Sequence, residues 1–316
     1  MLTAFSIREG RLQQHYVARQ EELDESVIWV DLMQPTPEER SWVEKSYTQA
    51  LPTPDELSEI EASARCYEDE DGLHVHAYFL QDSEQQPHNV TVAFTLKDGR
   101  LFTLHDEDIL SFRVFRMRAR RQPGYAVDAP SILQGLFEVK VERLADTLEQ
   151  MHTELEAISG LVFSQGTKKD LGMVLQRMGA IEDLNGKTRL SMMDKQRVLS
   201  YLLRRGTLSG DHVSSLREIL NDLKSLIVHS TFLFEKTSFL LNSTMGLINI
   251  EQNQIIKIFS IVAVIFLPPT LVASIYGMNF HWMPELSWKL GYPFALALII
   301  AAAYAPYWIF KRKGWL

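Results

Sequence analysis

The chain has 316 residues, of which 46% are hydrophobic, and a formal net charge of −8 at pH 7. Residues 251–316 hold five of the 32 basic and two of the 40 acidic residues, which leaves residues 1–250 with a net charge of −11. So acidic a region argues against nucleic-acid binding, which needs a basic surface, and it favours cationic partners. The single cysteine, Cys66, excludes an intrachain disulfide and a cysteine-based zinc site.

Residues 1–125 have the pattern of a cytosolic α/β domain. Apolar runs such as 73–80 and 90–96 are bounded by turn residues, which predicts strands. Asp98-Gly99 directly follows the second of these runs and predicts a hairpin. The N-terminal sequence lacks the basic start and long apolar stretch of a signal peptide, so we expect this domain to stay in the cytosol.

Residues 126–208 are expected to form a cytosolic helical region. No proline occurs from 131 to 267, and apolar residues recur at three-to-four spacing from Leu133 to Val162. Breaks are expected near Gly166 and across residues 205–210. Acidic residues lie on the other faces of the first helix, at Glu138, Glu142, Asp146 and Glu149.

Residues 209–276 are expected to form one long stalk helix, which at 1.5 Å per residue extends on the order of 100 Å. Its last part, 258–275, is a stretch of 18 residues without a charge, and a second such stretch lies within 292–310. Each is close to the roughly 20 residues that cross a bilayer. A buried core helix is the alternative for the first stretch, but a second stretch so close behind it favours two transmembrane spans.

Flanking residues orient these two predicted spans. The tail 311–316 begins with Lys311, Arg312 and Lys313, so the positive-inside rule places the C-terminus in the cytosol. With two spans the N-terminal domain is cytosolic too, and the loop 277–291 faces outside. Four of the six tryptophans flank the second span, as in an aromatic belt: Trp282, Trp288, Trp308 and Trp315.

One face of the predicted stalk helix carries small, polar and apolar residues at alternating spacings of four and three. This 3.5-residue repeat places them on a single seam, which Gly277 continues. Amides and hydroxyls with apolar constrictions suit a conduit for a hydrated ion. The alternative, that small residues here only let helices pack closely, stays open. The seam consists of Asn249, Asn253, Ile256, Ser260, Ala263, Leu267, Thr270 and Ser274.

Two helices cannot enclose a water path, so a pore on this seam requires several copies of the chain around an axis. The loop after the seam carries Tyr276-Gly277-Met278-Asn279-Phe280 and then Met283-Pro284-Glu285-Leu286. With these motifs, the second span and the basic tail, the chain resembles the CorA family of Mg²⁺ transport proteins. The signature of that family is Gly-Met-Asn after the first of two C-terminal spans. The resemblance covers the whole chain.

The resemblance implies a fold and an assembly. The expected fold is an α+β cytosolic domain followed by long helices and two C-terminal transmembrane helices, in a funnel-shaped homopentamer. The expected location is the bacterial inner membrane, with both termini cytosolic and the loop 277–291 periplasmic. The implied activity is potential-driven influx of Mg²⁺, and also of Co²⁺ and Ni²⁺, without ATP.

The resemblance also implies roles for particular residues. Gly277, Met278 and Asn279 form the selectivity filter, with the Asn279 side chains as the first ion site. Asn253 forms an inner ring, and Ile256, Leu267, Thr270 and Ser274 line the pore. Asn249, Ser260 and Ala263 join the pore-lining set from their spacing. One departure is His281, which stands where many relatives carry an acid and so reduces the negative charge of the loop.

Closure of the pore by cytosolic Mg²⁺ is a further expectation, because a conduit without a fuel step needs feedback. By resemblance the candidate ligands are Asp82, from the α/β domain, and Glu218 or Asp222, near the start of the stalk. The excess of acids in residues 1–250 supplies repulsion between neighbouring copies that a divalent cation relieves. The alternative, that these are ordinary solvated acids, stays open.

Other functions remain as alternatives to Mg²⁺ transport. A related zinc-transporter branch has the same architecture, and a non-conducting membrane-anchored Mg²⁺ sensor or scaffold is a second alternative. Asn185-Gly186-Lys187-Thr188 ends like a phosphate-binding loop, but it falls in a predicted helix and lacks the first glycine. His74 and His76 share a strand face, but no third metal ligand is evident, and a satisfied strand histidine is the more common reading. Residues 68–71 are expected to form a solvated turn before Gly72 and not a binding loop. No nucleophile and base converge, so an enzyme is not expected.

Overall fold

The computed structural model describes residues 1–53, 56–57, 61, 65–81, 87–164, 170–205, 210–279, 281 and 283–314. It divides into two compact units, Met1–Leu241 and Asn242–Leu316. The strands are β1 (Leu2–Arg8), β2 (Arg11–Tyr16), β3 (Val27–Met33), β4 (Cys66–Asp69), β5 (Gly72–Gln81), β6 (His88–Lys97) and β7 (Arg100–His105). The helices are η1 (Gln20–Glu22), α1 (Pro37–Tyr47), α4 (Leu110–Arg121), α5 (Ala129–Phe163), α6 (Leu171–Arg205), α7 (Gly210–Tyr276), η2 (Pro284–Ser287) and α8 (Gly291–Arg312).

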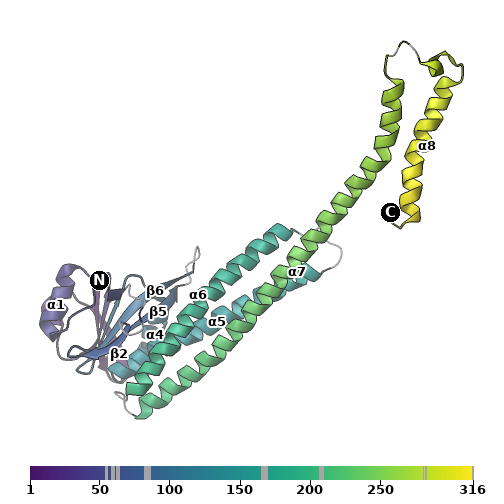
Figure 1. Ribbon diagram of the computed structural model, residues 1–316. Helices are drawn as coiled ribbons and strands as arrows, with labels where there is room; N and C mark the ends of the chain where they lie inside the picture. The colour runs from purple at the N-terminus through teal and green to yellow at the C-terminus, as the bar shows by residue number, and fades with distance from the viewer. Residues whose placement is uncertain are drawn as a thin grey trace. The chain divides into compact units, whose positions relative to one another are not determined.

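The seven strands of the N-terminal unit form one sheet in the order β2-β1-β3-β7-β6-β5-β4 (Figure 1). Neighbouring strands are antiparallel except β3 and β7, which are parallel. The hairpin predicted at Asp98-Gly99 is confirmed, since Lys97 pairs with Arg100 across it. Both turn residues have positive φ, at 49° and 72°. That geometry matches the strand twist in two-residue hairpins and explains the Asp-Gly pair.

Both faces of this sheet are covered, and alternate residues of each strand reach different layers. Val30 of β3 and Phe102 of β7 pack with Val43 of α1 on one face. On the other face Trp29 stacks on Phe5 with ring centroids 4.2 Å apart. Aromatic rings of α4 and α5 continue that layer, and they include Phe112, Phe115 and Phe137. Covering on both sides explains why these strands read as nearly continuous apolar runs.

On the side of β4, the second half of β5 has no strand partner among the described residues, because β4 pairs only as far as Val75. Side chains of α6 occupy the edge instead. The Tyr78 amide donates to Asp194 Oδ2 at 2.7 Å, and Ser191 Oγ and Lys195 Nζ donate to the Tyr78 carbonyl. Buried backbone groups require such partners, so charged side chains of α6 replace a ladder here and close an edge that would otherwise pair with another chain.

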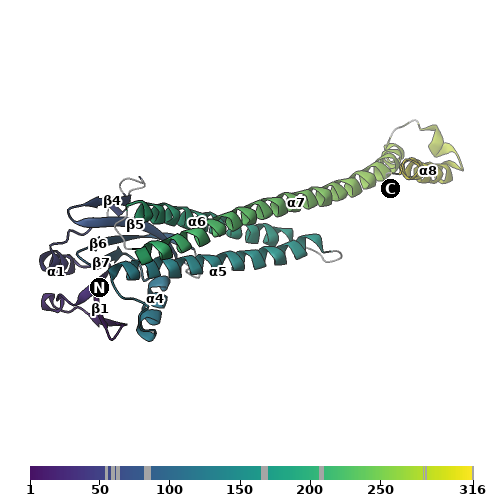
Figure 2. The ribbon, with the colours of Figure 1, turned by 90° about the horizontal axis from the view of Figure 1, so that it is seen from below.

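Polar contacts also join the helices of the N-terminal unit, where α5, α6 and the first part of α7 lie side by side (Figures 1 and 2). Asn185 Nδ2 donates to the Ser230 carbonyl at 3.1 Å, and Ser230 Oγ donates to Asn185 Oδ1 at 2.8 Å. Thr188 Oγ1 donates to the Leu184 carbonyl at 2.7 Å. Residues 185–188 are thus helical and bonded within the helix layer, as the sequence pattern predicts.

Two smaller expectations about the strands can be checked. His74 is a satisfied strand residue, as weighed, with its ring nitrogens 3.1 Å from Thr95 Oγ1 and 3.0 Å from Asp69 Oδ1. A solvated turn was expected over residues 68–71, but β4 continues to Asp69 and only Glu70 and Asp71 turn. Pairing with β5 extends the strand into this acidic stretch, which overrides its turn-like composition.

The C-terminal unit consists of the last part of α7, the loop with η2, and α8, which runs back alongside α7 (Figure 1). Both helices are long and apolar enough to cross a membrane, and their most apolar windows have no buried residue. α7 remains one helix through Pro268 and Pro269. Exposed apolar side chains in such density need a non-aqueous surrounding.

Candidate functional site

The predicted seam lies on an exposed face of α7. All eight of its helical residues, from Asn249 to Ser274, are exposed, and so is Gly277. Even the large apolar members remain open, with Ile256 60% and Leu267 65% exposed. The described residues of one chain therefore leave the whole seam uncovered.

A second face of α7 is half covered, and it lies nearly opposite the seam. Six residues between 258 and 276 have intermediate exposure, and at 100° per residue they cluster on the side of the helix away from Ser260 and Ser274. They are Ile261, Ile265, Pro268, Pro269, Val272 and Tyr276. α8 has a matching half-covered face with the same spacing, made of Ala295, Ile299, Ala302, Ala303, Pro306 and Phe310.

These two matching faces indicate which side of α7 is turned toward α8 and which side is turned away from it. Three of the six residues on the α8 face are alanines, and small residues are common where helices pack in membranes. Because α8 covers one side of α7, the seam points away from α8. The alternative reading, that the small seam residues serve packing within the chain, does not fit this arrangement, since these residues are exposed in the part of the chain that the structure describes. Packing between copies remains compatible with it.

Thr270 shows how a hydroxyl on the seam is held. Its Oγ1 donates to the Phe266 carbonyl at 2.7 Å, one turn earlier in the helix. The donor is thereby used internally, and the oxygen lone pairs stay available as acceptors. An acceptor facing the seam can receive a hydrogen bond from water around a cation.

The loop after α7 is built against the helix ends. The Gly277 amide donates to the Ala273 carbonyl at 2.9 Å, and a Cβ at Gly277 would lie 3.2 Å from that same oxygen. Met278 then donates to the Ile275 carbonyl at 3.2 Å, and Asn279 is exposed just beyond it. The Gly-Met-Asn segment therefore begins as the last turn of α7 and presents its amide side chain to solvent.

The second half of the loop closes onto α8. A Cβ at Gly291 would lie 2.2 Å from the Glu285 carbonyl oxygen, so only glycine fits there. The Gly291 amide donates to the Trp288 carbonyl at 2.9 Å, and the Trp288 ring lies 5.8 Å from that of Phe294. Close packing of η2 on the start of α8 fixes this end of the loop.

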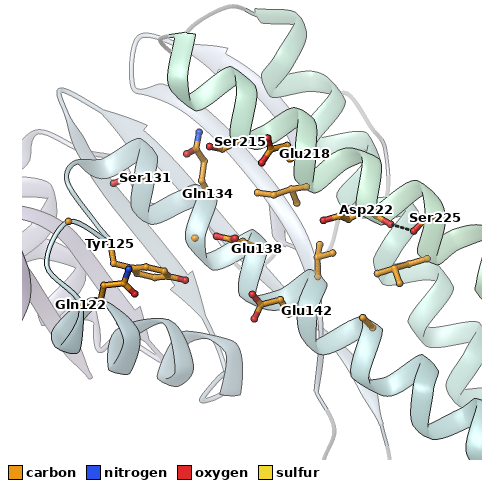
Figure 3. Close-up of a pocket in the computed structure, with 16 residues that line it drawn as sticks. Gln122, Tyr125, Ser131, Gln134, Glu138, Glu142, Ser215, Glu218, Asp222 and Ser225 are labelled. Carbon is orange, nitrogen blue, oxygen red and sulfur yellow. Dashed lines mark hydrogen bonds between the residues drawn. The ribbon is translucent and has the colours of Figure 1, made fainter.

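The acids predicted near the start of the stalk line a groove in the N-terminal unit. The groove lies between α5 and α7 and has a volume of about 690 Å³. Glu218 and Asp222 reach it from α7, and Glu138 and Glu142 reach it from α5 (Figure 3). Sequence reasoning named the α5 pair only as surface acids. Glu138 and Glu142 are four residues apart, and so are Glu218 and Asp222. This common spacing is the signal that could have linked the two pairs.

The groove carboxylates influence one another. Partial burial and the neighbouring Glu142 raise the pKa of Glu138 above its ordinary value, and Glu218 and Asp222 act in the same direction. Arg118 opposes this increase, and it also pairs with Glu142 at 2.7 Å. Three carboxylates therefore act on Glu138, and the guanidinium of Arg118 is the one positive group among these described residues that opposes them.

Within the described part of one chain, no three His, Cys, Asp or Glu side chains are arranged to hold a metal ion. Asp82, the third predicted regulatory residue, lies outside the described residues. The groove is therefore acidic and open, with ligand groups that lie near each other but do not form a closed coordination shell.

Comparison with known proteins gives the family. Residues 24–312 match the family described as CorA-like Mg²⁺ transporter protein. The "Magnesium transport protein CorA" of Salmonella typhimurium is 48% identical over 317 residues, and that of Escherichia coli K12 is 47% identical, with each chain covered completely. The chain belongs to the CorA-like Mg²⁺ transporter family, as its Gly-Met-Asn motif and its two C-terminal helices predict.

A solved structure supports the same fold. The complete CorA magnesium transporter from Methanocaldococcus jannaschii matches with a TM-score of 0.78 and 21% sequence identity. The match covers 100% of this chain and 99% of that one. An α/β domain, long helices and two apolar C-terminal helices are therefore the fold of this chain, as expected from the sequence.

Proposed function

We propose that this chain is a Mg²⁺ channel of the bacterial inner membrane that works as a homopentamer, with both termini in the cytosol. The observation that carries the proposal is the direction of the seam. Amides and hydroxyls of α7 remain exposed on the side away from α8, where copies around an axis would face one another. Full-length identity of 47–48% with proteins named for magnesium transport supports the choice of ion.

Selection by Asn279 follows from the chemistry of the ion. Mg²⁺ releases its water reluctantly and demands octahedral geometry. A ring of neutral amide oxygens can accept hydrogen bonds from the hydration shell and let the ion leave again, whereas carboxylates would retain it. Gly277 and Met278 place Asn279 at the end of α7, and the seam from Ser274 to Asn249 continues the path with Ile256 and Leu267 as apolar constrictions.

The membrane potential supplies the driving force, so no ATP is used and no reaction is catalysed. A doubly charged ion gains roughly 4.6 kcal/mol per 100 mV of inside-negative potential. That gain corresponds to a concentration limit of roughly 2,000-fold per 100 mV. Co²⁺ and Ni²⁺ are expected to enter by the same path, because the filter holds hydrated divalent ions.

Flux into liposomes containing the purified protein tests this proposal. Asn279→Ala should reduce Mg²⁺ uptake by at least about tenfold while assembly stays intact, because it removes the acceptors and no packing contact. Ser287→Ala, which removes a hydroxyl that bonds within the same loop, should conduct like wild type. Wild-type flux in Asn279→Ala would overturn the filter assignment, and absence of flux in the wild type would favour a sensor or scaffold.

Two further measurements separate the remaining alternatives. Competition among Mg²⁺, Zn²⁺, Co²⁺ and Ni²⁺ during uptake, with and without a proton gradient, distinguishes this function from that of the zinc-transporter branch. Mass measurement in detergent tests the assembly. A monomer at all concentrations would overturn the pore, because one copy cannot enclose a path.

We further propose that cytosolic Mg²⁺ closes the pore by bridging acids of neighbouring copies. Glu218 and Asp222 were chosen from resemblance together with Asp82, and the groove adds Glu138 and Glu142. The raised pKa of Glu138 supports the idea, since it reflects like charges that a cation would relieve. In a single chain the ligand set is incomplete, which fits a site that needs a second copy.

The double variant Asp82→Ala, Glu218→Ala tests this closure. It should stay open, or close only at higher internal Mg²⁺, and should lose protection of the cytosolic domain from protease by Mg²⁺. A matched control is Asp146→Ala with Glu149→Ala, which removes two acids of α5 outside the groove. Closure of the first variant at an unchanged Mg²⁺ concentration would show that the sensor lies elsewhere.

A further inference from the structure

A second cleft in the N-terminal unit has the opposite electrostatic character to the acidic groove. It has a volume of about 580 Å³ and lies at the end of the sheet where β2, β3 and β7 terminate. Residues of β2, β3, β7 and α4 line it, among them Tyr16, Met33 and His105 at the strand ends. The carboxyl ends of parallel strands, here β3 and β7, are the usual place for ligands in open sheets.

The wall of this cleft is a row of arginines. α4 carries five arginines in 12 residues and no acid. Arg113, Arg116, Arg120 and Arg121 have the spacing of one helix face, and all four line the cleft. The fifth, Arg118, points to the acidic groove and pairs with Glu142. Four guanidinium groups on one face are notable in a region whose net charge is −11.

The floor of the cleft holds a buried carboxylate that is already neutralised. Asp31 accepts hydrogen bonds from Thr103 Oγ1 at 2.6 Å, His105 Nε2 at 2.9 Å and Arg116 at 3.2 Å. His105 Nδ1 lies 2.6 Å from the Glu107 carbonyl. Because both partners of the ring are acceptors, both nitrogens donate and the imidazole is cationic.

The pKa values of this buried pair agree with the geometry. Burial opposes charge on Asp31, but His105, Thr103 and Arg116 outweigh it and lower the pKa of that carboxyl. Burial likewise opposes charge on His105, and Asp31 outweighs it and raises the pKa of the imidazole. The negative charge of Asp31 is thus balanced by its buried partners and does not neutralise the exposed arginines of the wall.

The remaining cations exceed their counter-charges. Arg113 and Arg116 share Asp108, at 3.3 and 3.7 Å. Arg120 donates to the uncharged side chain of Gln14, and Arg121 forms no ion pair with any described residue. Counting His105, the lining has five cationic side chains and two carboxylates, Asp31 and Asp108. The N-terminal ammonium of Met1 also lies in the lining and pairs with Glu39. The exposed arginines keep free N–H groups, since each guanidinium has five.

We propose that this cleft binds a small anion that carries a diphosphate group. Guanidinium forks match phosphate oxygens in pairs, and several forks in one cleft suit a compact, multiply charged anion. The cleft volume is in the range of small-molecule sites. The acidic surroundings would repel an extended polyanion such as nucleic acid, whereas a small anion meets only the local field. This site is independent of the proposed ion path.

Calorimetric titration of the purified full-length protein with inorganic diphosphate tests the proposal. The buffer contains EDTA and no Mg²⁺, because diphosphate chelates Mg²⁺ and its removal from the protein would otherwise imitate binding. Wild type should bind saturably, and Arg120→Gln with Arg121→Gln should weaken binding by about tenfold or more, since hydrogen bonds to charged groups are lost. Both residues are exposed, so this variant should fold.

A matched control removes two arginines elsewhere in the same domain. Arg11, at the far end of β2 from Tyr16, and Arg118, on the other face of α4, are changed to glutamine together. This variant should bind diphosphate like wild type. No saturable binding to wild type, or equal losses in both double variants, would overturn the site. Tighter binding of ADP than of diphosphate would identify a nucleotide as the source of the group, and equal binding would assign recognition to the diphosphate alone.

Discussion

The two units of the chain handle polar and apolar side chains in opposite ways. In the N-terminal unit rings such as Trp29 and Phe94 are fully buried, and even charged residues such as Lys195 are buried with partners. In the C-terminal unit the most apolar windows of α7 and α8 have no buried residue. Water drives the first arrangement, and the second requires a non-aqueous surrounding.

This contrast implies that the two units contribute differently to the stability of the chain and to the proposed ion flux. The N-terminal unit contains its own core, so its stability depends on contacts within one copy. The most apolar parts of the C-terminal unit are not buried within one copy, so the proposed function places their contacts with lipid and with other copies. Substitutions in the two units should therefore be distinguishable by whether they change unfolding or flux.

Asp194→Ala should give the largest change in stability, confined to the N-terminal unit. It leaves the buried guanidinium of Arg65, 3.3 Å from Asp194, without its counter-charge, and it leaves the Tyr78 amide without an acceptor. Breaking a buried pair in this way costs about 3–5 kcal/mol. Urea titration followed by pulse proteolysis measures the change. Asp183→Ala, at an exposed position of the same helix, should change stability by less than about 0.5 kcal/mol.

Gly291→Ala should disturb the C-terminal unit alone. The added Cβ would meet the Glu285 carbonyl oxygen at 2.2 Å, so the loop must shift, at a cost of about 1–3 kcal/mol. We expect reduced Mg²⁺ flux with unchanged unfolding of the N-terminal unit. Gly160→Ala is the matched control, because a Cβ there meets no atom within 4 Å. Equal flux in both variants would show that the loop conformation does not matter for transport.

Cysteine labelling sharpens the contrast within α7 itself. Ser274→Cys on the seam should react with a charged thiol reagent at least about tenfold faster than Val272→Cys on the side facing α8, because the thiolate must meet water to react. The native Cys66 gives little background, since burial, with a smaller contribution from Asp194, raises the pKa of its thiol to about 11. Equal rates at the two positions would contradict the direction assigned to the seam.

Glu138→Gln should give the smallest effect, with a pH dependence of definite sign. Because the pKa of Glu138 is raised in the folded protein, its ionised form destabilises the fold, and the substitution should stabilise the N-terminal unit near neutral pH. Solvent screening limits the gain to about 0.5 kcal/mol. The gain should vanish as pH falls through the raised pKa, where Glu138 is already protonated.

The sequence alone determined the features that depend on local pattern. Uncharged stretches of 18 residues predicted both apolar helices, because crossing hydrocarbon requires length and composition and no particular partner. The Asp98-Gly99 hairpin was predictable because its backbone angles demand those residue types. The seam emerged from spacing along one helix, and the Gly-Met-Asn motif identified the family.

Only the tertiary structure decided which side chains meet across elements. It brought Glu138 and Glu218 into one groove, and it placed Asp31 and His105 in contact beside the arginines of α4. It also placed Asp194 at the edge of β5. These partners lie far apart in the chain. Periodicity and composition predict on which face of its own helix or strand a residue lies, but not which other element packs against that face. Burial then determines whether a charged side chain needs a partner, because the free-energy cost of desolvating a charge is large only where water is excluded.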